Sequence, residues 1–118
     1  MARILIIDDD PMVRLPTRLI LQKAGHDVTE AMDGEEGLQF FKESSADLVL
    51  VDYKMPGIDG HEVVRELRNL SPKTKIIFAT GWDTPEEHSA DRVLAKPFGQ
   101  SGLLAIVEEL LQEGNEQT

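Results

Sequence analysis

The chain has 118 residues, 41% of them hydrophobic, and a formal net charge of −10. This length fits one domain with one core, and the acidic charge argues against direct binding to the phosphate backbone of nucleic acids. The chain contains no cysteine, which excludes disulfides, thiol catalysis and cysteine zinc sites and suits a reducing cytosol. The apolar run at residues 4–7 is too short for a signal peptide or a membrane span. We therefore expect a cytoplasmic protein that contacts neither nucleic acid nor membrane.

Strands and helices are predicted to alternate along the chain. In chain order they are a strand at 4–7, a helix at 11–24, a strand at 27–30, a helix at 34–43, a strand at 48–51, a helix at 60–70, a strand at 75–79, a strand at 92–95 and a helix at 100–112. Continuous apolar strands are typical of a parallel sheet covered on both faces. The alternation predicts right-handed crossovers and a doubly wound α/β sheet. The polar residues 114–118 are expected to form a disordered tail outside a single domain of residues 1–113.

The first predicted helix carries clear signals at both ends. Asp10 is expected to be its N-cap rather than a metal ligand, and Pro11 occupies the first helical position. Gly25 follows the last periodic residue and is predicted to end the helix.

Polar side chains follow four of the predicted strands. Asp8 and Asp9 come directly after the first strand, Asp52 after the third, Thr80 after the fourth and Lys96 shortly after the fifth. The carboxyl ends of parallel strands meet at one edge of the sheet, where open α/β folds bind their ligands. We therefore expect these side chains to converge on one site.

The predicted carboxylate cluster needs compensation for its negative charge. At a separation of ~4 Å and an effective dielectric constant of ~20, each carboxylate pair costs about 4 kcal/mol. Either the pKa values rise or a cation joins the oxygens, and Mg²⁺ suits a partly open site of hard oxygen ligands. A lysine and a hydroxyl across the site would bind phosphate oxygens. The combination predicts phosphoryl transfer onto a carboxylate.

Four sequence motifs carry a family resemblance. They are IIDDDP, VDYKMPGIDG, FATG and LAKPF, one at each of these strand ends and in this order. Over residues 3 to 112 the chain resembles the receiver domain of bacterial two-component response regulators. The resemblance implies a flavodoxin-like fold of five βα units with the strand order 2-1-3-4-5. It also implies a cis bond between Lys96 and Pro97, which proline permits.

The resemblance assigns the metal site by position. Asp9 would be a direct Mg²⁺ ligand, and Asp8 would act mainly through a coordinated water. Asp52 and the backbone carbonyl of Lys54 would complete the ligands from the protein.

The resemblance also assigns the phosphoryl chemistry. Asp52 would be the phosphoacceptor, Thr80 would bond the phosphoryl group and Lys96 would pair with it. Lys54 and Trp82 are expected to flank the water that later hydrolyses the acyl phosphate. The protein would be a signalling phosphoacceptor with intrinsic autophosphorylation and autodephosphorylation chemistry, not an enzyme. Its donor would be a sensor histidine kinase or a histidine phosphotransfer protein, and the sequence does not name its output partner.

Three alternatives remain at this point. The domain could be a phosphorelay intermediate, or a pseudo-receiver that binds partners without phosphorylation, although all five residues of the motif are intact. The Asp8-Asp9-Asp10 run also fits haloacid-dehalogenase-type phosphatases. Those enzymes need a longer chain and a second acidic motif after the fourth strand, where only Asp83 stands.

The sequence departs from the family pattern in the region before the fifth strand. Val93 replaces the usual tyrosine or phenylalanine three residues before Lys96, and Lys96 follows Thr80 by only 16 residues. The usual separation is longer by more than one helical turn. The fourth helix is therefore expected to be a stub at residues 85–89, as in receivers of hybrid histidine kinases. We expect such a domain to signal through the loops around the phosphoryl group.

Overall fold

A five-stranded parallel sheet forms the centre of the computed structural model, which describes residues 2–81 and 89–116. The strands are β1 (Arg3–Ile7), β2 (Asp27–Ala31), β3 (Leu48–Asp52), β4 (Lys75–Thr80) and β5 (Arg92–Ala95). Their order across the sheet is β2-β1-β3-β4-β5, and every neighbouring pair is parallel. The predicted doubly wound sheet and its strand order are confirmed.

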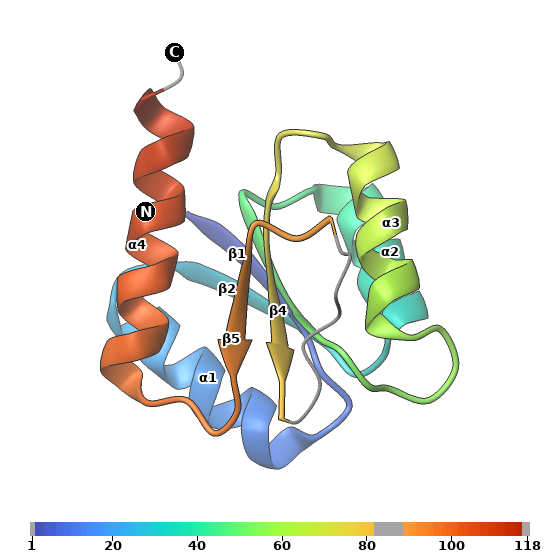
Figure 1. Cartoon of the computed structure of the whole chain (residues 1–118), viewed down its shortest axis with the longest axis horizontal. Helices are drawn as coiled ribbons and strands as arrows, with labels where there is room; N and C mark the ends of the chain where they lie inside the picture. The colour runs from blue at the N-terminus through green and yellow to red at the C-terminus, as the bar shows by residue number, and fades with distance from the viewer. Residues whose placement is uncertain (1, 82–88, 117–118) are drawn as a thin grey trace.

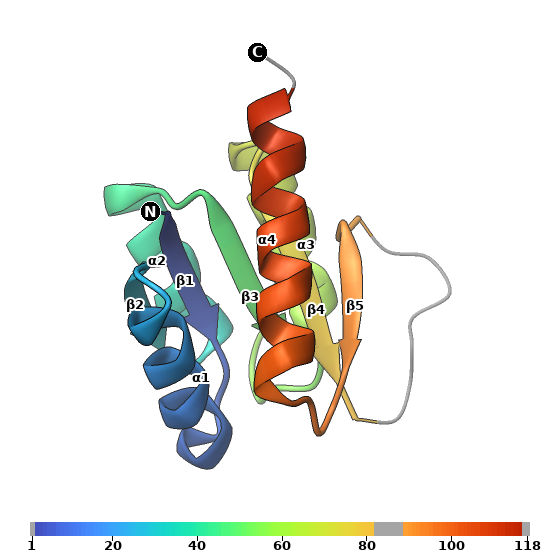
Figure 2. The ribbon, with the colours of Figure 1, turned by 90° about the vertical axis from the view of Figure 1, so that its left-hand side faces the viewer.

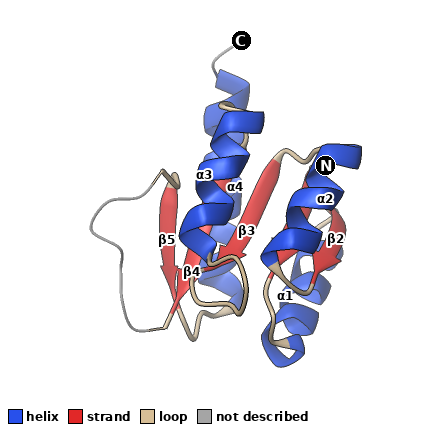
Figure 3. Cartoon of the chain, turned by 90° about the vertical axis from the view of Figure 1, so that its right-hand side faces the viewer, coloured by secondary structure: helices blue, strands red, loops and turns tan. Residues whose placement is uncertain are grey.

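Helices cover both faces of this sheet. They are α1 (Pro11–Lys23), α2 (Gly34–Ser44), α3 (Gly60–Leu70) and α4 (Gln100–Glu116). In Figure 1 the sheet stands between α1 and α4 on one face and α2 and α3 on the other. Figure 2 shows the face that carries α1 and α4, and Figure 3 shows α2 and α3 over the opposite face. None of the helices in the described ranges is both long and apolar enough to cross a bilayer.

The sheet divides the hydrophobic core into two clusters. On the α2 and α3 face, Leu5, Ile7 and Phe78 pack with residues of both helices, and on the α1 and α4 face Ile4 and Ile6 do the same. Successive side chains of a strand point to opposite faces. Because both faces are covered, both sets of side chains are buried, and the strands therefore appear as unbroken apolar runs.

Aspartates fix the starts of three helices on the edge of the sheet where the strands end. The side chains of Asp10, Asp33 and Asp59 each accept a hydrogen bond from a main-chain N–H of the first helical turn at 2.8–2.9 Å. Such caps satisfy N–H groups that have no partner within the helix. The predicted cap at Asp10 is confirmed, and Gly25 takes a positive φ of 99° directly after Ala24, the C-cap of α1.

Two further predictions concern a short helix at residues 85–89 and a disordered tail at residues 114–118. The expected stub at 85–89 lies outside the described residues except for Ser89, which is not helical. The helix α4 continues to Glu116, so residues 114–116 are helical, although a disordered tail was predicted there. A single glycine such as Gly114 costs a helix about 1 kcal/mol, which a long helix can tolerate. Residues 117–118 lie outside the description.

Candidate functional site

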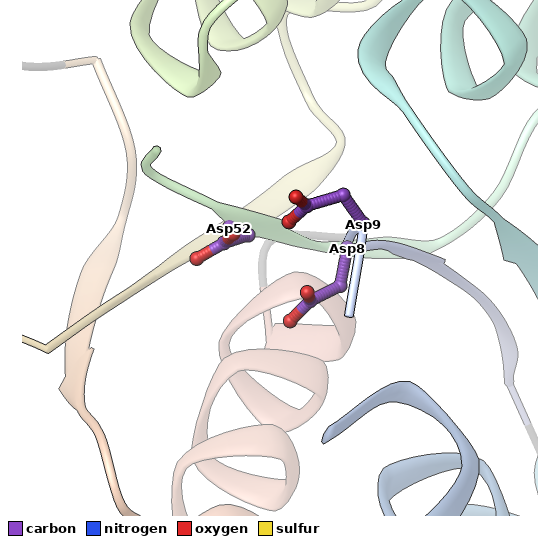
Figure 4. A group of neighbouring side chains, drawn as sticks. All are labelled: Asp8, Asp9 and Asp52. Carbon is purple, nitrogen blue, oxygen red and sulfur yellow. The ribbon is translucent and has the colours of Figure 1, made fainter. Parts of the chain in front are cut away.

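The structure brings the predicted carboxylates together at the ends of two neighbouring strands. Asp8 and Asp9 directly follow β1, and Asp52 is the last residue of β3. One oxygen from each of the three carboxylates lies within 4.8 Å of the other two, and Figure 4 shows the three side chains side by side. Asp8 and Asp52 are only 4% and 8% exposed, whereas Asp9 is exposed. The site therefore has two buried carboxylates, Asp8 and Asp52, and one exposed carboxylate, Asp9.

Lys96 places its ammonium group between two of these carboxylates. Its Nζ donates hydrogen bonds to Asp52 Oδ1 at 2.8 Å and to Asp8 Oδ2 at 3.1 Å. The main-chain N–H of Lys96 also donates to the carbonyl of Thr80 at 2.8 Å. Thr80 is the last residue of β4, is 7% exposed, and is brought to the same edge of the sheet by its pairing with Ala95. The Lys96–Pro97 bond is cis, as the resemblance predicts.

The charges of the site are not balanced. The pKa of Asp52 is raised from 3.8 to about 6, chiefly by burial; the hydrogen bond from Lys96 acts against this rise, and the negative charges of Asp8 and Asp9 add to it. Burial lowers the pKa of Lys96, but its hydrogen bonds and the charges of Asp52 and Asp8 outweigh burial, so the pKa lies above its usual value. One ammonium therefore does not compensate the carboxylates fully, and the set of oxygens fits a hard divalent cation.

A close approach of α3 supports the main chain at Asp52. The N–H of Gly60 donates to the carbonyl of Tyr53 at 2.9 Å. A Cβ atom at Gly60 would lie 2.3 Å from the carbonyl oxygen of Asp52, and such a contact does not occur in real structures. Only glycine allows the helix to begin directly against the end of β3.

The structure says less about three other residues that the sequence singled out, which are Lys54, Trp82 and Val93. Lys54 lies in the turn between β3 and α3 and is exposed, and the role of its carbonyl stays a prediction. Trp82 lies outside the described residues. Val93, at the position of the usual aromatic residue, is half-buried against the core cluster under α2 and α3.

Arg14 lies behind the site and contacts its main chain, although the sequence did not single it out. Its Nη1 donates to the main-chain carbonyl of Asp8 at 2.7 Å, and its Nε donates to Glu30 Oε1 at 3.0 Å. A sequence signal does exist, because a cation in the first turn of a helix opposes the helix dipole and needs another reason to be there. The partner on β2 could not be deduced without the strand register.

Comparisons with known proteins agree with this geometry. Residues 4–108 match the family described as the response regulator receiver domain. The response regulator MprA of Mycolicibacterium vanbaalenii is 38% identical over 117 residues, which cover 94% of this chain and 51% of that protein. The chain spans about half the length of the curated relatives it matches.

Solved structures show the same fold over most of the chain. The CheY-like receiver domain protein of Methanospirillum hungatei JF-1 has a TM-score of 0.95 and 31% identity, covering 100% of this chain and 99% of that one. The response regulator TrrA of Thermotoga maritima, in complex with Mg²⁺-BeF, has a TM-score of 0.87 and 36% identity and covers 93% and 99%. With the family match over most of its length and the acidic site at the strand ends, the chain belongs to the response regulator receiver domain family.

Proposed function

We propose that Asp52 is the residue that accepts the phosphoryl group in this receiver domain, in a reaction that depends on Mg²⁺. The observation that carries this assignment is the position of its carboxylate. It lies at the end of β3, 2.8 Å from Lys96 Nζ and within 4.8 Å of oxygens of Asp8 and Asp9. Among the described carboxylates, only these three meet in one cluster of this kind.

The cation would be held by Asp8, Asp9 and Asp52 together with the main-chain carbonyl of Lys54. All of these donors are oxygens, which Mg²⁺ prefers, and a partly exposed site leaves room for the waters that it retains. When bound, Mg²⁺ neutralises charge on the phosphoryl oxygens. The Mg²⁺-BeF complex of the similar protein TrrA supports this choice of metal.

The protein groups supply the remaining chemistry. A carboxylate oxygen of Asp52 attacks the phosphorus of a phosphohistidine, and the P–N bond breaks with its electron pair going to the imidazole nitrogen. Lys96 gives up a contact with Asp52 to pair with the phosphoryl oxygens, and the hydroxyl of Thr80 donates a hydrogen bond to one of them. Attack by water later returns the carboxylate and releases inorganic phosphate.

The donor would be a sensor histidine kinase or a histidine phosphotransfer protein in the cytoplasm, and a small acyl phosphate would act as a slow donor. The phosphoryl group can change the conformation only through contacts that differ between two states. Contacts of Thr80 and Lys96 with the phosphoryl group would supply this difference.

The test is phosphorylation of the whole chain by acetyl phosphate in Mg²⁺, followed by intact-mass measurement and mapping of the modified residue. We expect one phosphoryl group on Asp52, none in Asp52→Asn, and none when a chelator replaces Mg²⁺. The matched control is Asp33→Asn, which changes the cap of α2 and should accept phosphate as the wild type does.

Absence of phosphate from both acetyl phosphate and a panel of phosphorylated kinases would contradict the proposal. It would place the domain among pseudo-receivers. Modification at a carboxylate other than Asp52 would also refute the assignment.

A further inference from the structure

Arg14 links three segments of the chain around the acidic turn. It belongs to the first turn of α1, which packs beside β2 (Figure 2). Its Nη1 donates to the carbonyl of Asp8 at 2.7 Å and its Nε to Glu30 Oε1 at 3.0 Å. The side chains of Arg14 and Glu30 are 16% and 22% exposed. Charge-assisted hydrogen bonds are strong in such partly dry surroundings.

The location of this arginine is unfavourable for a cation by itself. The N-terminus of a helix carries partial positive charge, and α1 has no acidic residue in its first turn. The planar guanidinium, however, holds its N–H donors in a rigid fork and can fix two separated acceptors relative to each other, whereas an ammonium group is a compact charge on a flexible stem. The geometry of its two acceptors therefore accounts for Arg14 better than its charge does.

The carbonyl that Arg14 holds belongs to the peptide group between Asp8 and Asp9. The N–H of Asp8 donates to the carbonyl of Ala31 at 3.2 Å, and its carboxylate is held by the N–H of Asp10 and by Lys96. By contrast, the Asp9 carboxylate has no hydrogen bond or ion pair within the described part of the chain. The planar Asp8–Asp9 peptide group that Arg14 holds leads directly into Asp9, and it therefore limits where the Cα atom of Asp9 and its side chain can lie.

We propose that Arg14, braced by Glu30, is a positioning residue that aims the Asp9 carboxylate toward the cation site. This inference rests on the proposed function, since it assigns a role toward the cation that Asp8 and Asp9 are proposed to bind. Residues that orient metal ligands without touching the metal commonly change its affinity by 10- to 100-fold.

The sign of the effect separates positioning from simple electrostatics. Removal of a positive charge near the site would strengthen cation binding, and retention of the charge would leave binding unchanged. Arg14→Lys keeps the charge but loses the two-acceptor geometry. On the positioning hypothesis, this variant should weaken Mg²⁺ binding and raise its dissociation constant about tenfold. The phosphorylation rate from acetyl phosphate at saturating Mg²⁺ should stay within about twofold, because Arg14 does not touch the reacting atoms.

The experiment is a calorimetric titration of the full chain with MgCl₂, with circular dichroism to verify that each variant is folded. The second variant is Glu30→Gln, which keeps the shape of the brace but loses its charge and should weaken binding about threefold. The matched control is Arg18→Lys, because Arg18 Nη1 contacts Glu30 at 2.9 Å but none of its atoms bonds to Asp8. It should bind Mg²⁺ within about twofold of the wild type.

The outcomes distinguish this inference from the proposed function. If the wild type binds Mg²⁺ and Asp52→Asn changes its affinity, but Arg14→Lys equals the wild type, the positioning role is overturned alone. Equal weakening in Arg18→Lys and Arg14→Lys would also overturn it. If the wild type binds no Mg²⁺, both proposals fall. If Arg14→Lys does not fold, Arg14→Gln decides, because loss of the positive charge would tighten Mg²⁺ binding by electrostatics alone, whereas loss of positioning would weaken it.

Discussion

At the scale of single residues, the buried carboxylate of Asp52 is costly to the fold. Its pKa is raised to about 6, chiefly by burial, so the folded chain binds this proton more readily than the unfolded chain does. The stability that this group contributes is complete below its ordinary pKa of 3.8 and is lost as the pH rises through about 6. At neutral pH the carboxylate of Asp52 is therefore ionised in surroundings that disfavour its charge.

We expect Asp52→Asn to stabilise the metal-free protein near pH 7.5 by about 2 kcal/mol, because it removes the buried charge. The gain should shrink as the pH falls from about 6 to about 4, where wild-type Asp52 becomes protonated. Urea unfolding in the presence of a chelator measures both values. The control Asp27→Asn alters an exposed carboxylate on β2 and should change stability by less than about 0.5 kcal/mol. A less stable Asp52→Asn at neutral pH would contradict this account.

Lys96 competes with the cation for the same oxygens. Its Nζ holds one oxygen of Asp52 and one of Asp8. Lys96→Met should therefore bind Mg²⁺ about tenfold more tightly, as expected when a positive charge leaves a partly buried site. Direct Mg²⁺ titration would detect this change, and weaker binding would show that Lys96 organises the carboxylates more than it competes.

At the scale of elements, α3 begins in close contact with the main chain at the end of β3. We expect Gly60→Ala to destabilise the domain by about 2–4 kcal/mol, because its Cβ would collide with the main chain of Asp52 and Tyr53. The matched control is Gly102→Ala in α4, where a Cβ meets nothing within 4 Å. It should be neutral or stabilise by up to about 1 kcal/mol. Thermal and urea unfolding would compare the two, and equal effects would refute the collision.

Most elements were predictable because their signals are local. The unbroken apolar run of β1 reports a strand covered on both faces, and Asp10 marks the start of α1 by its chemistry. The convergence of Asp8 and Asp52 followed from a general property of parallel sheets. The link between Arg14 and Glu30 was not predictable, because it depends on how α1 packs on β2. The end of α4 was also missed, since helix termini are weakly encoded.

At the scale of the whole molecule, cation binding is coupled to folding. The unfolded chain lacks the cluster, so Mg²⁺ should raise the free energy of unfolding by about 2.7 kcal/mol at a concentration 100 times its dissociation constant. Denaturant unfolding at increasing Mg²⁺ would measure the effect. Asp9→Asn should abolish most of it without lowering metal-free stability. An equal gain in the variant would place the stabilising ion elsewhere.

Binding of a phosphoryl mimic should also change the main chain along the edge of the sheet where the strands end. If the domain signals through the loops around Asp52, chemical shift changes on adding beryllofluoride and Mg²⁺ should concentrate in the segments that follow β1, β3 and β4. Backbone NMR of the whole chain would map them. Large changes confined to residues 97–112 would contradict this mode of signalling.

The ion pair between Lys96 and Asp8 joins residues 88 positions apart in the chain. A ribosome releases the three aspartates long before it releases the lysine that pairs with them. A nascent chain therefore carries the whole acidic cluster without its ammonium group, and without the last strand and helix of the fold. On the proposed function, the ability of Asp52 to accept a phosphoryl group would therefore arise only when synthesis of the domain is nearly complete.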